Sequence, residues 1–181
     1  SSLTEDTFIL NDQKQSLEDS KRVFNYIHLL QEKFGMTDHF TIRSTNHVPT
    51  SAGLASSASA FAALATSFAA SYGLDLSKKE LSRLARLGSG SATRSVYGGF
   101  VEWKKGFDDE SSYAVPIDEN PDLDLSLLAI EVNTKQKKIS STKGMQLAQT
   151  SPFYQPWLAR NEEEIAEIKK AIQNNDFTRI G

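Results

Sequence analysis

The sequence predicts an α+β fold, because stretches with strand and helix patterns interleave along its 181 residues without the strict alternation of a doubly wound sheet. Hydrophobic residues make up 39% of the chain and charged residues 24%, which is the composition of a globular protein. At roughly 150 residues per domain, this length corresponds to one domain and part of a second. The chain has no cysteine, which excludes a disulfide framework, a thiolate metal site and a cysteine nucleophile.

The N-terminal part of the chain predicts a strand, a helix and a second strand. The β-prone run 7–10 leads into the turn-forming pair Asn11-Asp12. Across 16–34 apolar residues recur at helical spacing, and Gly35 stands where a glycine commonly ends a helix. Residues 39–44 then alternate apolar and polar side chains, as a half-buried strand does.

Two helices are expected next. Turn-forming residues at the start of 49–60 lead into an alanine-rich helix that continues to Tyr72 and Gly73. Small residues surround this helix on all sides, which predicts burial against neighbours on several faces. Ser77 and Glu80 form a capping box that opens a second helix, ending at Gly88.

The remainder of the chain predicts further strands and a final helix. After the small, polar loop 88–95, β-prone segments occur at 100–103, 113–117 and 125–132, and a polar, lysine-bearing loop follows at 134–143. A last amphipathic helix is expected over 161–174, with Asn161 and Glu164 as its capping pair.

Charge and hydropathy exclude several classes of partner. The net charge of −3 provides no basic excess for nucleic-acid binding. The longest apolar run, 60–65, is far shorter than the ~20 residues that span a bilayer, so no membrane span is expected. The first residues lack the pattern of a secretory signal, and no Met opens the chain. A cytoplasmic location and a cut N-terminus are therefore expected. The three histidines lack the spacing of metal ligands and are expected to have structural roles.

Two loops combine hydroxyl groups with a flexible backbone. Gly53 and the serines that follow precede or begin a helix, where free amides and the helix dipole bind phosphate. A serine-capped helix packed through alanines is the structural alternative. The loop is not a Walker A motif, because no lysine occurs between Arg43 and Lys78.

The second loop, 89–94, adds the guanidinium of Arg94, which is able to bind an oxyanion. Two such loops predict two phosphate-bearing ligands.

These motifs resemble those of a known family. The run NHVPTSAGLASSAS at 46–59 is similar to the ATP-phosphate motif of the GHMP kinase superfamily. The run GSGSATRSVYGGF at 88–100 closely resembles the signature of the diphosphomevalonate decarboxylases, and KISSTKGM at 138–145 is similar to their serine segment. The resemblance implies a GHMP-kinase-like N-terminal domain at 1–120 and the beginning of the family's C-terminal domain at 121–181, truncated at both ends.

The implied activity is ATP-dependent phosphorylation of the 3-hydroxyl of mevalonate 5-diphosphate, followed by loss of phosphate and CO₂ to give isopentenyl diphosphate. ATP and Mg²⁺ are the implied cofactors, a small molecule is the implied substrate, and a homodimer is the implied assembly. Carried over by position, the ATP-binding residues are Gly53, Leu54, Ala55, Ser56, Ser57 and Ser59. The substrate-binding residues are Ser89, Gly90, Ser91, Arg94 and Ser141, and of these Arg94 and Ser141 are also assigned to catalysis. The two serine loops are expected to face each other.

The chain also departs from the family pattern. It lacks both the N-terminal lysine-bearing strand motif and the later Asp-Ala-Gly loop that supplies the expected catalytic Asp. Its own candidates, Asp108, Asp109, Glu110 and Asp118, occur in polar turns and are interpreted as solvated. The 181 residues alone are therefore predicted to be inactive. The alternatives are a GHMP small-molecule kinase acting on mevalonate or phosphomevalonate, and a non-catalytic nucleotide-binding fragment.

Overall fold

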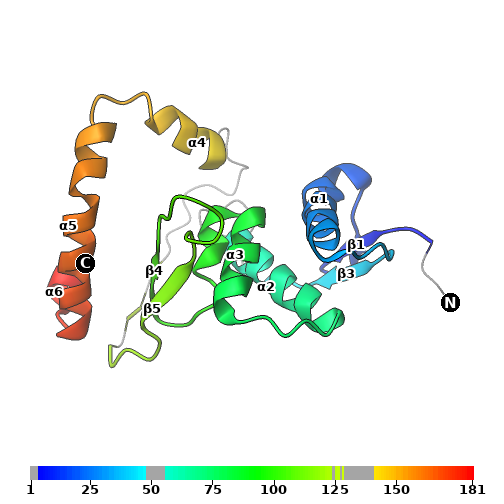
Figure 1. Cartoon of the computed structure of the whole chain (residues 1–181), viewed down its shortest axis with the longest axis horizontal. Helices are drawn as coiled ribbons and strands as arrows, with labels where there is room; N and C mark the ends of the chain where they lie inside the picture. The colour runs from blue at the N-terminus through cyan, green and yellow to red at the C-terminus, as the bar shows by residue number, and fades with distance from the viewer. Residues whose placement is uncertain (1–3, 48–55, 124, 127, 129–140) are drawn as a thin grey trace. The chain divides into compact units, whose positions relative to one another are not determined.

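The computed structural model describes residues 4–47, 56–123, 125–126, 128 and 141–181 (Figure 1). It divides the chain into two compact units. Unit 1 contains Ser1–Val96 and Trp103–Ala114, and unit 2 contains Tyr97–Glu102 and Val115–Gly181. Helix and sheet are mixed, which confirms the α+β class. Among the described helices, none has the length and hydropathy that a membrane span requires.

Unit 1 begins with a small sheet in the order β2-β1-β3. Strand β1 (Thr7–Leu10) pairs antiparallel with β2 (Gln13–Lys14) and parallel with β3 (Thr41–Ser44), with Thr7 opposite Thr41. Asn11 and Asp12 have φ angles of 49° and 63°. Both residue types tolerate this left-handed conformation, which a two-residue hairpin turn requires. The predicted strands and turn are confirmed.

Helix α1 (Leu17–Phe34) connects β2 to β3, and its ends are specified locally. The Ser16 hydroxyl accepts a hydrogen bond from the Asp19 amide at 3.1 Å, which caps the N-terminus. At the other end Gly35 has φ +69°, and its amide donates to the carbonyls of the last turn. The predicted helix and its glycine stop are confirmed.

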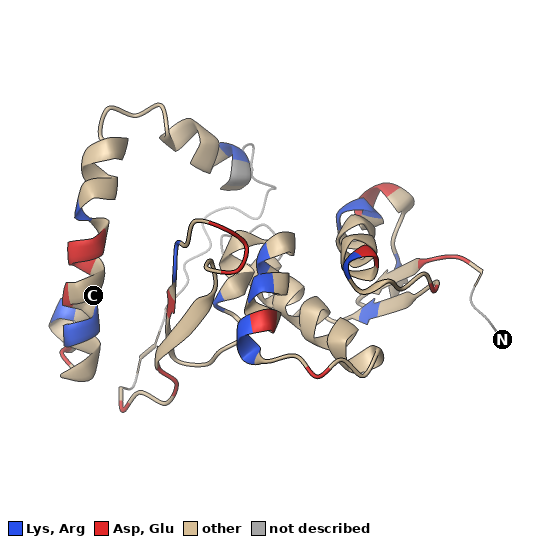
Figure 2. Ribbon diagram, in the orientation of Figure 1, with Lys and Arg blue, Asp and Glu red and all other residues tan. Residues whose placement is uncertain are grey.

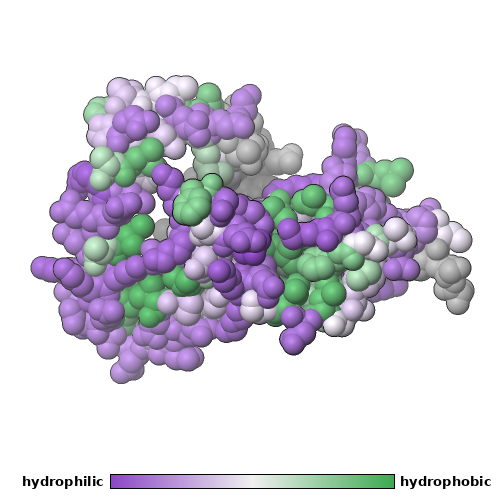
Figure 3. Space-filling model, in the orientation of Figure 1, coloured by the Kyte–Doolittle hydropathy of each residue, from purple (hydrophilic) through white to green (hydrophobic). Residues whose placement is uncertain are grey.

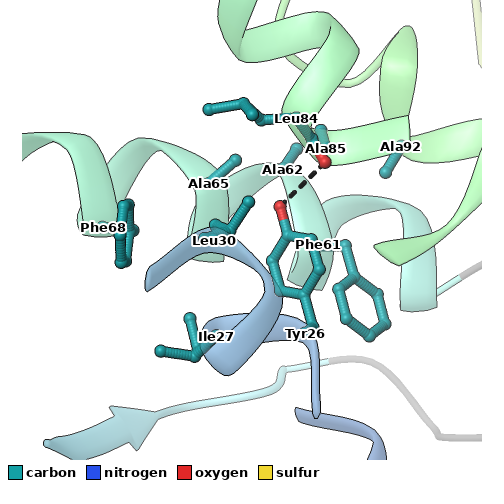
Figure 4. Close-up of a cluster of buried hydrophobic side chains, with 10 residues drawn as sticks. All are labelled: Tyr26, Ile27, Leu30, Phe61, Ala62, Ala65, Phe68, Leu84, Ala85 and Ala92. Carbon is teal, nitrogen blue, oxygen red and sulfur yellow. Dashed lines mark hydrogen bonds between the residues drawn. The ribbon is translucent and has the colours of Figure 1, made fainter. Parts of the chain in front are cut away.

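Helices α2 (Ser56–Ser71) and α3 (Lys78–Gly88), with the short 3-10 helix η1 (Gly90–Thr93), pack on α1 around the core of unit 1 (Figure 4). The Tyr26 and Phe61 rings meet edge to face at 4.9 Å, and the Tyr26 hydroxyl donates to the Leu84 carbonyl at 3.0 Å. Burial raises the pKa of this phenol. The predicted capping box of Ser77 and Glu80 is present.

The prediction that α2 is buried on several faces is wrong. Phe61, Ala65 and Phe68 are buried, but Ala60 and Ala63 on the same helix are exposed. Small side chains permit close packing without requiring it, so their presence on all sides did not define a buried face. The space-filling view in Figure 3 shows apolar residues gathered over α1 and α2.

Strands β4 (Phe100–Trp103) and β5 (Ala114–Asp118) pair in a two-stranded sheet, as their β-prone sequences predict. The loop between them is held by its own polar groups. The Ser111 amide donates to Asp108 Oδ1 at 2.7 Å, and the Ser111 hydroxyl accepts from the Phe107 amide at 2.9 Å. The expected strand at 125–132 lies largely outside the described residues.

Unit 2 ends in the helices α4 (Ser141–Ala148), α5 (Tyr154–Gln173) and α6 (Phe177–Ile180). Two predictions are wrong here. Ser141 begins a helix instead of lying in a loop, and α5 begins at Tyr154, so Asn161 lies inside the helix and does not cap it. Pro156 did not block the earlier start, because a first-turn amide has no intrahelical partner to lose.

Candidate functional site

The start of α2 and the turn after α3 approach each other in unit 1. Ser57 lies in the first turn of α2, and Ser89 directly follows α3. Their hydroxyl oxygens are 3.4 Å apart, and the same distance separates the hydroxyls of Ser89 and Ser91. Three hydroxyl groups from segments about 30 residues apart in sequence therefore form one cluster.

A close helix crossing brings these loops together. Phe61 lies one turn after Ser57 on the same face of α2. A Cβ atom on Gly88 would stand 2.0 Å from Phe61 Cδ1, so only a glycine allows the end of α3 to pass this ring. Ser89 then leaves the helix in an extended conformation with φ −157°. Because Gly88 lies against Phe61, the next residue reaches Ser57.

A pair of buried hydroxyl groups lies behind the 89–94 turn. Ser82 and Thr93 are both fully buried. The Ser82 hydroxyl donates to the Thr93 carbonyl at 2.8 Å and accepts from the Ala114 amide at 2.9 Å. The Ser82 proton is thus used, so the Thr93 hydroxyl donates across the 2.7 Å contact between the two side chains. This arrangement connects α3, the turn and the start of β5.

Arg94, which follows this turn, is exposed. Its guanidinium carbon lies 5.9 Å from the centre of the Trp103 ring, and no carboxylate in the described part of the chain pairs with it. Trp103 Nε1 donates to the Ser112 hydroxyl at 3.1 Å. A Cβ on Gly90 would stand 3.0 Å from the same ring. The indole therefore lies against both ends of the turn, and the arginine charge remains available.

Other predicted site residues are placed differently. Gly53, Leu54 and Ala55 lie outside the described residues. Ser56 is half-buried in the first turn of α2, and the Ser59 hydroxyl donates to its carbonyl at 3.1 Å, within that helix. Ser141 is exposed at the start of α4 in unit 2, whereas the serine cluster belongs to unit 1.

Asp109 is not the solvated carboxylate that the sequence suggested. Arg83 and Arg86 donate to its two oxygens at 2.6 and 2.5 Å, and Lys33 Nζ lies 3.9 Å away. The Arg83 hydrogen bond holds the pKa of Asp109 below its ordinary value. Figure 2 shows the basic residues along α3. A carboxylate with a lowered pKa is a poor general base near neutral pH, so Asp109 is structural.

The sequence interpretation missed the contacts of Ser82, Thr93, Trp103 and Asp109. A signal existed for the last of these, because Arg83 and Arg86 are three residues apart on one helix face and require an anion nearby. Nothing in the sequence singled out Ser82, since a serine inside an amphipathic helix has the same appearance whether it is buried or solvated.

Comparisons with known proteins match the chain along most of its length. A family model described as "Diphosphomevalonate decarboxylase-like N-terminal domain" matches residues 1–114, and one described as "Mevalonate 5-diphosphate decarboxylase C-terminal domain" matches 127–181. The predicted boundary at residue 120 falls between these matches and stays a prediction.

Among curated proteins, the diphosphomevalonate decarboxylase of Ganoderma lucidum is 48% identical over 75% of this chain and 35% of its own length. That of Aspergillus fumigatus is 36% identical over 95% of this chain and 47% of its own. The chain therefore spans less than half the length of these two relatives.

Among solved structures, mevalonate diphosphate decarboxylase from Staphylococcus aureus aligns with a TM-score of 0.87 and 46% identity, covering 99% of this chain and 55% of that one. A structure described as MDDEF in complex with MVAPP, AMPPCP and magnesium aligns with a TM-score of 0.82 and 41% identity, over 99% and 55% of the two chains.

Proposed function

The chain belongs to the diphosphomevalonate decarboxylase family and has its GHMP-kinase fold, and we propose that it forms part of an enzyme converting mevalonate 5-diphosphate to isopentenyl diphosphate with ATP. The observation that carries the proposal is the 3.4 Å approach of the Ser57 and Ser89 hydroxyls. Two phosphate-bearing ligands held at these loops lie next to each other, as phosphoryl transfer from one to the other requires.

Each of the two loops is proposed to bind one of the two ligands. The start of α2, with 53–57 and Ser59, holds the ATP phosphates, while Ser89, Gly90 and Ser91 hold the substrate diphosphate. Arg94 provides the positive charge for the substrate carboxylate and diphosphate region, and Ser141 is assigned to the reacting hydroxyl. Positioning and charge stabilisation account for most of the catalysis of phosphoryl transfer.

Mg²⁺ fits this site through the nucleotide. The described residues include no group of three or more His, Asp or Glu side chains placed to hold a metal ion. Mg²⁺ is commonly bound by substrate phosphates with few protein ligands, and it neutralises their charge during transfer. The hydroxyls of Ser57 and Ser59 suit the phosphate oxygens of such a complex.

We propose that residues 1–181 alone do not turn over substrate. Asp109 is engaged by two arginines, and hydrogen bonds from Ser111 lower the pKa of Asp108. Neither carboxylate is suited to accept the proton of the substrate hydroxyl. Calorimetry of this chain with a non-hydrolysable ATP analogue, alongside a turnover assay, tests this part. Turnover would contradict it, and binding without turnover in the full protein as well would favour the non-catalytic alternative.

Release of labelled CO₂ from mevalonate 5-diphosphate with ATP and Mg²⁺ tests the reaction in the full protein. We expect CO₂ and phosphate in equal amounts. A stable phosphorylated product without CO₂ would identify a kinase, an alternative that the decarboxylase relatives do not favour.

Ser57→Ala should lower kcat/KM about tenfold, through a lost phosphate hydrogen bond. The matched control is Ser67→Ala, on the same helix.

The assembly and location are also part of the proposal. A homodimer in the cytoplasm rests on the resemblance to the family and on the composition of the chain. Sedimentation equilibrium of the full protein measures the first, and cell fractionation measures the second. A monomer at every concentration would contradict the dimer, and recovery with membranes would contradict the location.

A further inference from the structure

The Ser82–Thr93 hydroxyl pair is the most completely hydrogen-bonded polar group buried beside the proposed site. Both side chains are fully buried, and their three contacts are all 2.9 Å or shorter. They lie under a turn whose own backbone bonds run from the Ala92 amide to the Ser89 carbonyl at 2.9 Å and from the Arg94 amide to the Ser91 carbonyl at 3.3 Å, both within the turn. The pair, by contrast, ties the turn to α3 and to the start of β5 through buried hydrogen bonds.

We propose that Ser82 and Thr93 are positioning residues that fix the Arg94 side chain for binding the substrate diphosphate and carboxylate. Consecutive Cα atoms are 3.8 Å apart, so an immobile Thr93 sets the point from which the Arg94 side chain extends. The Ser82 hydroxyl holds the Thr93 carbonyl and side chain together, and the Ala114 amide holds Ser82. This inference rests on the proposed function, because it assigns a role within the same site.

The contact of Arg94 with Trp103 shows why backbone anchoring matters. The guanidinium carbon is 5.9 Å from the ring centre, near the outer limit for a cation–π interaction. A contact this long restrains an exposed side chain weakly. The backbone that the buried pair holds therefore sets the region that the Arg94 guanidinium can reach.

The chain offers a control for each residue, which is buried in the case of Ser20 and exposed in the case of Thr66. Ser20 is buried like Ser82, but its hydroxyl donates at 2.7 Å to the Ser16 carbonyl within α1. Thr66 donates at 3.0 Å to the Ala62 carbonyl within α2. Ser20→Ala and Thr66→Val thus remove the same groups without releasing the turn.

The test compares Thr93→Val, Thr93→Ser and Ser82→Ala with these controls in the full protein. We expect Thr93→Val to lower kcat/KM for mevalonate 5-diphosphate by about tenfold or more, since a misplacement of about 1 Å caused by a mutation away from the reacting atoms can cost about 100-fold. The affinity for a non-hydrolysable ATP analogue should stay within about twofold. Thr93→Ser should restore kcat/KM, and the control variants should retain it.

Equal kcat/KM in Thr93→Val and the unaltered protein would overturn the inference, as would a parallel loss of substrate and nucleotide affinity, which indicates general structural damage. Should Ser82→Ala fail to fold, the Val and Ser variants of Thr93 still decide the matter. Absence of CO₂ release from the unaltered protein is a separate result, which overturns the proposed function itself.

Discussion

Arg94 is exposed and has no carboxylate partner among the described residues, which separates its effect on activity from its effect on stability. In the described part of the chain it contacts only the Trp103 ring among charged or aromatic groups. Arg94→Ala in the full protein should lower kcat by about 100-fold or more, because a charge-assisted contact in the transition state is lost. The melting temperature should change by less than about 2 °C. An unchanged kcat/KM would contradict the role assigned to this residue.

Gly88 is the residue that sets the distance between the two serine loops. A Cβ at this position would overlap the Phe61 ring at 2.0 Å, so Gly88→Ala forces α3 away from α2. We expect a loss of about 1–3 kcal/mol in the free energy of unfolding, measured by urea denaturation. Gly144→Ala is the control, because nothing lies within 4 Å of a Cβ there and alanine favours the helix. Equal free energies of unfolding for Gly88→Ala and Gly144→Ala would contradict the close packing of α3 on α2 at Gly88.

Asp6 joins the N-terminal strand region to α1 and β3 through His28 and His39, at 2.7 and 2.9 Å. Burial alone would raise the pKa of this carboxyl, but hydrogen bonds from both histidines and the Phe40 amide outweigh it and hold the pKa below its ordinary value. The stabilisation is therefore complete above about pH 4 and is lost as the pH falls through the lowered pKa.

Asp6→Asn should accordingly lower the melting temperature by about 2–4 °C at pH 6 and progressively less below pH 4. Thermal denaturation between pH 2.5 and 7 measures this difference. Asp75→Asn, at an exposed position between α2 and α3, serves as the control and should show no such trend. A constant difference at all pH values would show that Asp6 acts by packing alone.

At the scale of elements, the loop between β4 and β5 is held against α3 by Asp109. Arg83 and Arg86 are each about one-fifth exposed, and removal of their carboxylate leaves two guanidinium groups partly buried without compensation. Asp109→Asn should lower the melting temperature and speed proteolysis within 104–113. Glu110→Gln alters the exposed neighbour and should have neither effect. An unchanged rate of proteolysis within 104–113 in Asp109→Asn would contradict the proposed role of Asp109 in holding this loop against α3.

Helix ends were predicted correctly where a local sequence signal specifies them, and they were predicted wrongly where no such signal exists. Ser16, Gly35 and the Ser77 capping box act through hydrogen bonds within a few residues, so the sequence contains the whole cause. The start of α5 at Tyr154 has no side-chain cap, and the apolar period that predicted this helix begins later, at Ile165. The exposed face of α2 depends on which neighbours are present, and no local pattern encodes that.

At the scale of the whole molecule, the motif 88–100 was enough to predict the family, because its glycines and serines have a specific spacing, and the interleaved helix and strand patterns predicted the α+β class. The contacts that build the candidate site were only partly predictable. An approach of the two serine loops was expected from ligand chemistry, whereas the Ser82–Thr93 pair and the Asp109 attachment join residues 11 and 26 positions apart and depend on the folded arrangement.

Disulfide trapping tests the central claim, the approach of the two serine loops, most directly. The chain has no cysteine, so Ser57→Cys/Ser89→Cys introduces one possible disulfide. Hydroxyl oxygens 3.4 Å apart show that the ends of the two side chains meet, so sulfur atoms at these positions can approach each other. Mild oxidation should form it quickly, as mass spectrometry of peptides would show, whereas Ser67→Cys/Ser89→Cys should remain reduced. Two cysteines that each react with a thiol reagent but do not join would contradict the account.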